Sequence, residues 1–190
     1  MEAILQLLEG SPEQRDCGYH LFFYRNCEFP SIMRSVRTVD DLQAVNSFFE
    51  RYVLNDLQGS PNPILIADAL ISCDVFLNFV PEASIMQILQ RCVGLLTETS
   101  ESVRVLSVIT IDRILTKYQP SRDYQRESIL EANSVESVLV PSNLESLIIP
   151  LTEYLLNVSM PLKQTDHFLI KTYLRIVLFM NEKVFSVHEQ

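Results

Sequence analysis

The residues that could do chemistry are few, and they lie far apart in the sequence. Cys17 and His20 are three positions apart, which is the spacing of two metal ligands on one helix, and Cys27 follows two turns later. A structural zinc site needs four ligands, and no second pair of cysteine or histidine residues occurs at such a spacing. We therefore interpret Cys17 as a buried thiol and His20 as a surface imidazole, and we predict neither a metal nor a cofactor.

Catalysis by a nucleophile and a base is not indicated either. His167 and His188 are distant from His20 along the chain, and the sequence contains no GxSxG, GxGxxG or GK[ST] motif. Only four residues are glycine, which disfavours loops that grip phosphate groups. Asp74 and Asp112 are expected on helix surfaces, where carboxylates are usually solvated. We predict that the chain is not an enzyme.

The composition is that of an acidic globular chain. Of the 190 residues, 47% are apolar, and 15 basic against 24 acidic side chains give a net charge of −9. A nucleic-acid-binding protein normally carries a basic stripe, so the charge favours basic protein partners instead. No apolar stretch is long enough to cross a membrane, and the N-terminus lacks the features of a signal peptide. The scattered cysteines favour reduced thiols in the cytosol or nucleus.

Capping residues and apolar periodicity predict helices over almost the whole chain. Ser11-Pro12-Glu13-Gln14 combines an N-cap, a first-turn proline and a capping box, and Asn62 precedes Pro63 in a similar way. Apolar residues recur at steps of three and four over stretches longer than a strand can sustain. We predict an all-α fold with helices over 1–9, 12–26, 41–57, 63–79, 82–98, 102–118, 143–157 and 166–181.

A shift of 39 residues relates two of these helices, and Pro120 maps onto Pro81 by the same shift. The two matching stripes are Val103, Leu106, Thr110, Ile114 and Tyr118, and Ile64, Ala67, Ile71, Val75 and Phe79. A two-helix repeat of about 40 residues is typical of HEAT and armadillo proteins. We predict one α-solenoid segment over 1–190, with about three complete helix pairs, a partial first pair and an inter-repeat loop over 119–141. Because both ends are apolar, we expect it to be a piece of a longer solenoid.

Several runs of residues resemble one family of nuclear transport receptors. The run from Asp41 to Leu57, DLQAVNSFFERYVLNDL, is similar to the family pattern L-x-x-F-F-x-x-x-[IV]-L-x-D-L. A polar loop, a helix rich in Ala and Ile, and the turn Val80-Pro81 then follow in the family's order. Further similar runs are Gln14 to Leu21, Glu101-Ser102-Val103 and Thr110 to Leu115. Over most of 12–180 the chain resembles the importin-α re-exporters, the CAS-type exportins of the importin-β superfamily.

The resemblance implies a HEAT-repeat protein that binds importin-α together with Ran in its GTP form in the nucleus. Both partners would be released in the cytoplasm after GTP hydrolysis by Ran. In the family, a long insertion after the helix that matches 12–26 contacts both partners, but here the stretch 28–40 has only 13 residues. The alternatives are a different importin-β-type receptor and a HEAT scaffold subunit of another multiprotein complex.

Helix residues outside the apolar stripes are expected to face outward, and we predict that they form a partner surface. In solenoids, binding residues are concentrated in loops and at exposed helix positions. Arg34 and Arg37, in the short stretch 28–40, would pair with carboxylates on a partner such as Ran, whereas Asp68 and Asp74 would suit a basic cargo segment. The predicted partner-binding residues are Arg34, Arg37, Asp68, Asp74, Arg104, Asp112, Arg113 and Lys117. Ser72, Asn78 and Ser107 are predicted on the same outward faces.

Overall fold

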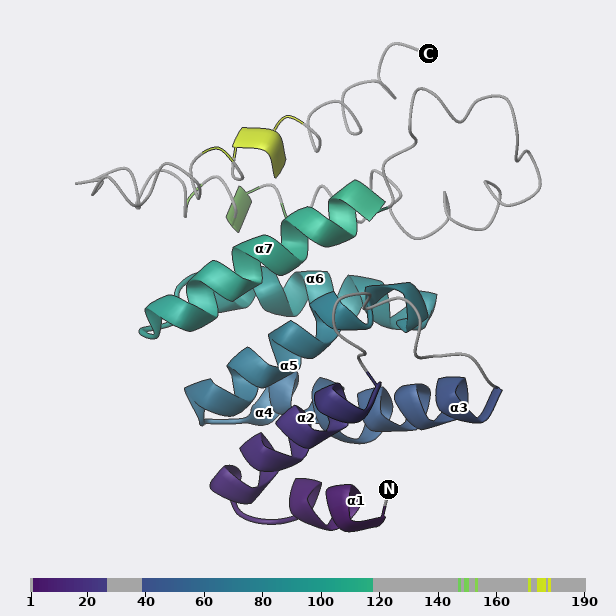
Figure 1. Cartoon of the computed structure of the whole chain (residues 1–190). Helices are drawn as coiled ribbons and strands as arrows, with labels where there is room; N and C mark the ends of the chain where they lie inside the picture. The colour runs from purple at the N-terminus through teal and green to yellow at the C-terminus, as the bar shows by residue number, and fades with distance from the viewer. Residues whose placement is uncertain are drawn as a thin grey trace, which may run out of the picture. The chain divides into compact units, whose positions relative to one another are not determined.

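Helices make up all of the regular secondary structure in the described part of the computed structural model (Figure 1). The structure describes residues 2–26, 39–117, 147, 149–150, 153, 171, 174–176 and 178. The chain divides into two compact units, residues 1–81 and residues 82–190. The predicted all-α fold is confirmed. Among the described residues, no helix has both the length and the apolar character needed to cross a bilayer.

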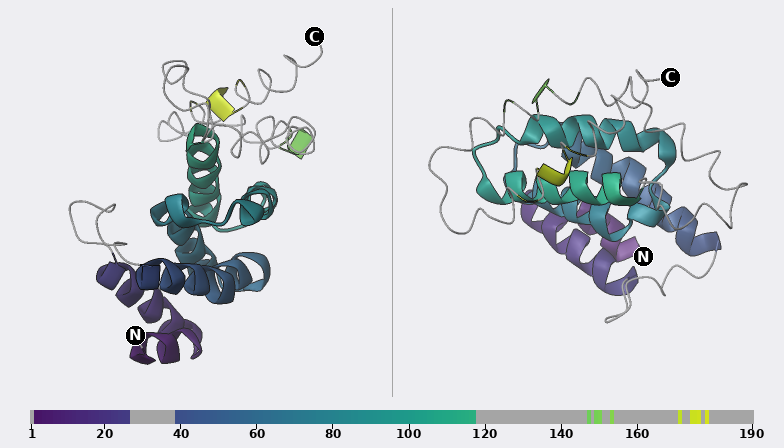
Figure 2. Two further views of the ribbon diagram at one scale, coloured as in Figure 1. Left: turned by 90° about the vertical axis from the view of Figure 1, so that its right-hand side faces the viewer. Right: turned by 90° about the horizontal axis from the view of Figure 1, so that it is seen from above.

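The helices of the first unit pack against one another, and their course can be followed by colour in Figure 2. Its elements are α1 (Glu2–Leu8), α2 (Pro12–Asn26), α3 (Val39–Phe48), the π-helix η1 (Phe49–Val53), α4 (Leu54–Gly59), α5 (Pro63–Val75) and the 3-10 helix η2 (Leu77–Phe79). α1 packs against α2, and α5 packs against η1, α4 and α2. Every helix predicted before residue 81 is therefore present, with ends that differ by a few residues.

The predicted capping residues explain why two of these helices begin where they do. The Ser11 backbone N–H donates to Gln14 Oε1 at 2.8 Å, and the Gln14 N–H donates to Ser11 Oγ at 3.4 Å, which forms a capping box. At the start of α5, the Ile64 N–H donates to Asn62 Oδ1 at 2.9 Å, and Pro63 occupies the first turn. These bonds satisfy backbone donors that a helix start leaves unpaired.

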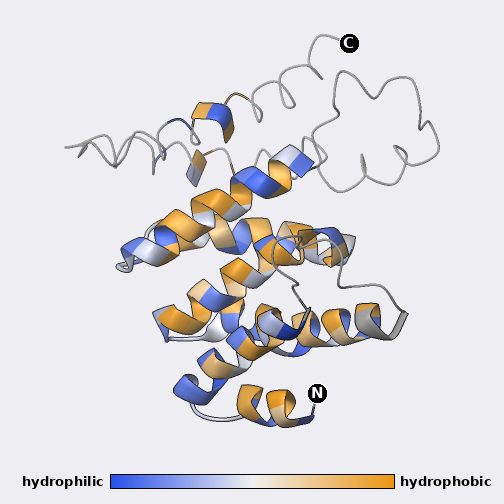
Figure 3. Cartoon of the chain, viewed as in Figure 1, coloured by the Kyte–Doolittle hydropathy of each residue, from blue (hydrophilic) through white to orange (hydrophobic). Residues whose placement is uncertain are grey.

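Aromatic side chains from α2, α3 and the end of α5 form the centre of the first unit. Phe48 stacks on Phe22 with ring centroids 3.8 Å apart, and it forms T-shaped ring contacts with Tyr19 and Phe76. All four side chains are at most 2% exposed. Hydrophobic and hydrophilic residues alternate along the helices of this unit (Figure 3), as expected when each helix buries one face. Burial of these rings contributes to the stability of the unit.

The second unit is built on the helix pair α6 (Glu82–Leu95) and α7 (Glu101–Lys117), which pack against each other. Its core includes Ile85, Ile88, Leu89 and Cys92 of α6 and Val103, Val108, Ile111 and Ile114 of α7. The described residues in 143–157 and 166–181 are helical, and Leu147 and Ile176 are buried. The loop predicted over 119–141 lies outside the described residues.

The predicted 39-residue shift is wrong, because it pairs buried positions in one helix with exposed positions in the other. Val103 is 0% exposed, but Ile64, its predicted counterpart, is 56% exposed, and Leu106 is only half-buried. A shift of 38 residues instead pairs buried positions with buried positions. The pairs are Val103 with Leu65, Val108 with Leu70, Thr110 with Ser72, Ile111 with Cys73 and Ile114 with Phe76. The physical reason is that α5 is apolar nearly all round, so that several stripes fit its sequence and only packing selects one.

Gly18 allows α1 to approach α2 closely. A Cβ atom at this position would lie 2.9 Å from Leu8 Cγ and 3.2 Å from the Leu8 backbone nitrogen. Because Leu8 is 1% exposed, it cannot move aside without disturbing the packing of α1. We expect Gly18→Ala to lower the free energy of unfolding by about 1–3 kcal/mol, the usual effect of overpacking. A urea titration followed by circular dichroism measures this change.

Gly94 provides the matched control for this substitution. It lies in the last turn of α6, and a Cβ atom there would meet nothing within 4 Å. Since alanine is the better helix former, Gly94→Ala is expected to raise the free energy of unfolding by about 0.5–1 kcal/mol. Equal stabilisation by both substitutions would contradict the close packing of α1 on α2.

Candidate functional site

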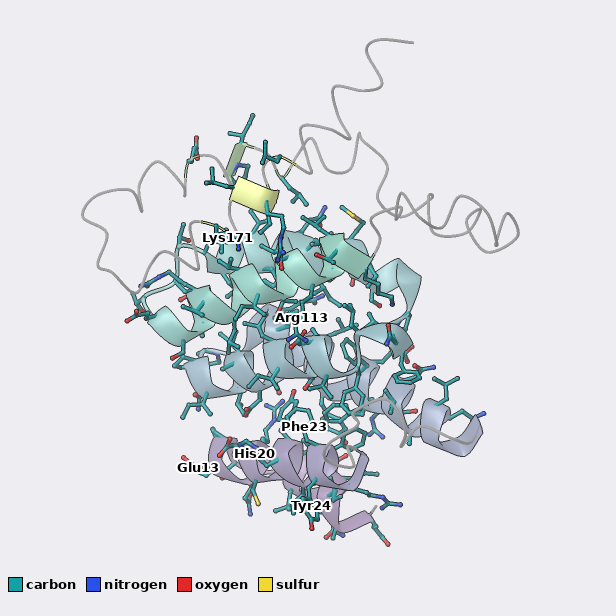
Figure 4. All side chains as sticks on the ribbon, turned by 45° about the horizontal axis from the view of Figure 1, so that its top comes forward. Glu13, His20, Phe23, Tyr24, Arg113 and Lys171 are labelled. Atoms are coloured by element: carbon teal, nitrogen blue, oxygen red, sulfur yellow. The ribbon has the colours of Figure 1, made fainter. Side chains whose placement is uncertain are left out.

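Polar and charged side chains gather between α2, α4 and α5 in the first unit. Protein interiors rarely hold such groups unless they are paired, and here Asp56 and Asp68 are only 2% and 4% exposed. His20, an exposed member of the group, can be located on α2 in Figure 4. We call this group the polar cluster, and it comprises Arg15, Asp16, Tyr19 and His20 of α2, Asp56 of α4 and Asp68 of α5.

One half of the polar cluster joins α2 to α4 around Asp56. Arg15 Nη2 donates to Asp56 Oδ1 at 2.5 Å, and the Tyr19 hydroxyl donates to Asp56 Oδ2 at 2.8 Å. Burial raises the pKa of Asp56, although the bond from Tyr19 and the charge of Arg15 act in the opposite direction. Burial and the neighbouring carboxylate raise the pKa of Tyr19 far above its ordinary value. Tyr19 therefore remains a neutral donor, and this half of the cluster is a structural connection.

The π-helix η1 explains why Asp56 faces the interior. Buried positions between Val45 and Leu57 repeat every four residues, at 45, 49, 53 and 57 and at 48, 52 and 56. An α-helix turns once in 3.6 residues, so this stripe would drift by about 120° around an α-helix over that distance. The wider turn, closed by the bond from the Leu54 N–H to the Phe49 carbonyl oxygen, absorbs the drift. This four-residue repeat is the sequence signal that could have indicated a buried Asp56.

The other half of the polar cluster brings Asp16, His20 and Asp68 together. One ligand atom from each lies within 4.8 Å of those of the other two, and His20 Nε2 is 3.4 Å from Asp16 Oδ1. The Asp16 carboxyl group is also close enough to Asp68 to raise its pKa. The sequence indicated His20 as an exposed imidazole but did not indicate the two carboxyl groups beside it. Asp16 and Asp68 are 52 positions apart in the sequence, so only the packing of α2 on α5 places them together.

Burial and the nearby carboxylates Asp16 and Asp56 raise the pKa of Asp68 to about 7. The ordinary value is 3.8, so the folded protein holds this proton more tightly than the unfolded chain does. The stabilisation from the neutral form is therefore complete below about pH 4. It is lost as the pH rises through about 7.

We expect Asp68→Asn to flatten the dependence of stability on pH. In the parent chain, the free energy of unfolding should contain a component that falls between about pH 4 and about pH 7, because over that range the unfolded chain has lost this proton while the folded chain still holds it. Asparagine keeps the shape of the group but cannot lose a proton. Urea titrations of both chains across this range measure the difference. Parallel pH profiles for the two chains would mean that Asp68 does not titrate in this range.

The predicted orientation of three polar residues is wrong. Asp68, Ser72 and Ser107 were predicted to face outward, but they are 4%, 0% and 0% exposed. Each serine hydroxyl donates to the carbonyl oxygen four residues earlier, at 2.7 Å for Ser72 and 2.8 Å for Ser107. A helical serine satisfied in this way can be buried at little cost. Asp68 is buried because α2 packs over it, so it is not available to a cargo segment.

Two other predicted partner-binding residues make contacts inside the second unit. Arg104 donates to the carbonyl oxygens of Glu98 and Thr99, at 2.6 and 3.1 Å, and so holds the turn between α6 and α7. Asp112 was predicted to face solvent, but its side chain is only 13% exposed and accepts two hydrogen bonds from Arg175. The bond from Arg175 Nε to Asp112 Oδ1 measures 2.6 Å. Both side chains therefore contribute to the packing of the unit.

The remaining predicted positions differ in exposure. Arg113 and Lys117 of α7 are exposed, as predicted, and Asp74 is half-buried. Arg34 and Arg37 lie outside the described residues.

The cysteines also depart in part from the prediction of buried thiols. Cys17 is exposed, whereas Cys73 and Cys92 are buried. Burial raises the pKa of Cys92 to about 12, so this thiol is inert at neutral pH. The prediction of a buried thiol is therefore wrong for Cys17, which lies at an exposed position of α2.

The comparisons with known proteins do not place this chain: no protein-family model, no curated protein and no solved structure matches it.

Proposed function

We propose that this chain is a non-enzymatic, protein-binding segment of a nuclear transport receptor that binds importin-α together with Ran-GTP. The observation that carries the proposal is the order and spacing of the sequence runs that resemble CAS-type exportins. Two of these runs are helical: 41–57 forms most of α3, η1 and α4, and 110–115 lies within α7. The acidic net charge of −9 supports a basic partner segment.

The matched residues serve packing, so partner contacts fall elsewhere. Phe48, Phe49, Val53, Asp56 and Leu57 of the 41–57 run are all buried. A family pattern of buried residues specifies a helix pair, and contacts to other proteins then need exposed side chains near it. The candidates are basic side chains that would pair with carboxylates on Ran, whereas the acidic balance of the chain suits the basic importin-α segment. Arg113 and Lys117 at the end of α7 are exposed, and Arg34 and Arg37 lie in the stretch 28–40, outside the described residues.

A binding assay with purified components tests the proposal. Importin-α is immobilised, and the chain is added with Ran that carries either a non-hydrolysable GTP analogue or GDP. We expect retention of the chain to be strongest when importin-α and GTP-form Ran are both present, and to be lost with GDP. A folded chain that is retained by neither partner would overturn the proposal and favour a HEAT scaffold of another complex.

Charge-reversal variants separate a specific surface from general electrostatic attraction. Arg113→Glu with Lys117→Glu, and Arg34→Glu with Arg37→Glu, should each weaken retention by about tenfold or more, because each introduces like charges at a contact. The matched control is Arg25→Glu with Lys171→Glu, which makes the same charge change at exposed positions outside the proposed surface. Figure 4 labels Arg113 and Lys171. Equal losses in all three variants would indicate non-specific attraction only.

A further inference from the structure

We propose that Asp16, His20 and Asp68 form a binding site for a divalent transition-metal ion, with Zn²⁺ as the best match. The site lies in the first unit, between α2 and α5. The site is independent of the proposed transport function. Its ligands differ from the pair Cys17 and His20, whose spacing in the sequence is that of two metal ligands.

The spacing of the donor atoms suits such an ion. Asp16 and His20 are four residues apart on α2, so they lie on one face of the helix. The distance of 3.4 Å from His20 Nε2 to Asp16 Oδ1 is about the separation of two ligands bound to one tetrahedral zinc ion at ordinary bond lengths. Asp68 contributes a third donor from α5, within 4.8 Å of both.

A buried, unpaired oxygen of Asp68 is the second observation that points to a ligand. Asp68 is 4% exposed, and its Oδ2 atom is closed off from solvent and has no hydrogen-bond partner in the described structure. An unsatisfied carboxylate oxygen in such a place costs free energy. A cation bound between Asp68 and Asp16 would remove that cost.

The local charge favours a cation as well. The carboxyl groups of Asp16 and Asp56 both lie near Asp68, while the guanidinium of Arg15 is bound to Asp56. A cation at this place would offset the repulsion between the Asp16 and Asp68 carboxyl groups.

The donor types select the class of ion. One imidazole with two carboxylates suits Zn²⁺ and its first-row neighbours, whereas Mg²⁺ and Ca²⁺ prefer oxygen ligands alone. The Asp16 and His20 side chains are 39% and 66% exposed, so an ion can reach the site from solvent. Three protein ligands leave a fourth position for water. A bound ion would fasten α2 to α5.

Isothermal titration calorimetry tests this site on the whole chain after treatment with EDTA and dialysis. We expect one Zn²⁺ ion to bind per chain and Mg²⁺ not to bind. Asp68→Asn and His20→Ala should each weaken the Zn²⁺ affinity by at least about tenfold, by comparison with the 10- to 100-fold effect of losing an outer-shell partner.

Two control variants exclude other donors on the same helix. Glu13→Gln removes an exposed carboxylate one turn before the site, and Cys17→Ser removes the exposed thiol next to Asp16. Both should bind Zn²⁺ like the parent chain. The proposal is overturned if the folded parent chain does not bind Zn²⁺, if Asp68→Asn and His20→Ala bind it unchanged, or if Cys17→Ser abolishes binding. Circular dichroism of each variant confirms that it is folded.

Discussion

Replacing Asp56 by alanine should lower the free energy of unfolding by about 3–5 kcal/mol, the range found when one partner of a buried ion pair is removed. The Asp56 carboxylate is 2% exposed and accepts hydrogen bonds from Arg15 and Tyr19. Without it, the Tyr19 hydroxyl, in a residue that is 0% exposed, has no acceptor, and the guanidinium of Arg15 loses its counter-charge. The connection between α2 and α4 is lost at the same time.

Urea titrations of a small variant set measure this effect. Tyr19→Phe alone should cost about 1–2 kcal/mol, because it removes one hydrogen bond but leaves the ion pair. The double variant, Asp56→Ala with Tyr19→Phe, leaves no hydroxyl without an acceptor. Its loss of stability should therefore be less than the sum of the losses in the two single variants. Asn55→Ala, at an exposed position of the same helix, should change stability by less than about 0.5 kcal/mol. Equal effects of Asn55→Ala and Asp56→Ala would contradict the inward orientation of Asp56.

Replacing Phe48 by alanine is expected to cost about 3–5 kcal/mol. Phe48 is 1% exposed and contacts the rings of Phe22, Tyr19 and Phe76. Alanine would leave a cavity among side chains from α2, α3 and the end of α5. The surrounding helices can fill that cavity only in part, so the lost contacts add to the lost burial of the ring.

The same urea titration, read by circular dichroism, measures this cost against an exposed aromatic residue. Tyr24 lies on α2 and is 86% exposed, so Tyr24→Ala should change stability by less than about 0.5 kcal/mol. Phe48→Leu keeps most of the volume and should cost less than Phe48→Ala. Similar losses for Tyr24→Ala and Phe48→Ala would show that the aromatic cluster is not the centre of the unit.

Helix positions followed from the sequence because their signals are local. The Ser11 and Asn62 caps make hydrogen bonds to backbone groups two or three residues away, and such bonds need no tertiary partner. Apolar spacing then limits the helix lengths. For this reason 12–26 was predicted with the same bounds that α2 has.

The buried face of each helix was harder to predict because it depends on neighbours far along the chain. The 39-residue register failed at Ile64 since α5 offers apolar residues on several faces. Asp112 was expected in solvent, yet it pairs with Arg175, 63 residues later. Helical periodicity cannot predict a partner so far along the chain.

The sequence by itself determined that the chain is helical, where its helices begin, and that the common catalytic motifs are missing. These properties depend on residue types and on spacings of a few positions. Only the tertiary structure decided that Asp56 and Asp68 are interior and that Asp68 meets Asp16 and His20. The physical reason is that a carboxyl group becomes buried when another helix covers it, and the packing of α2 against α5 joins residues about 50 positions apart.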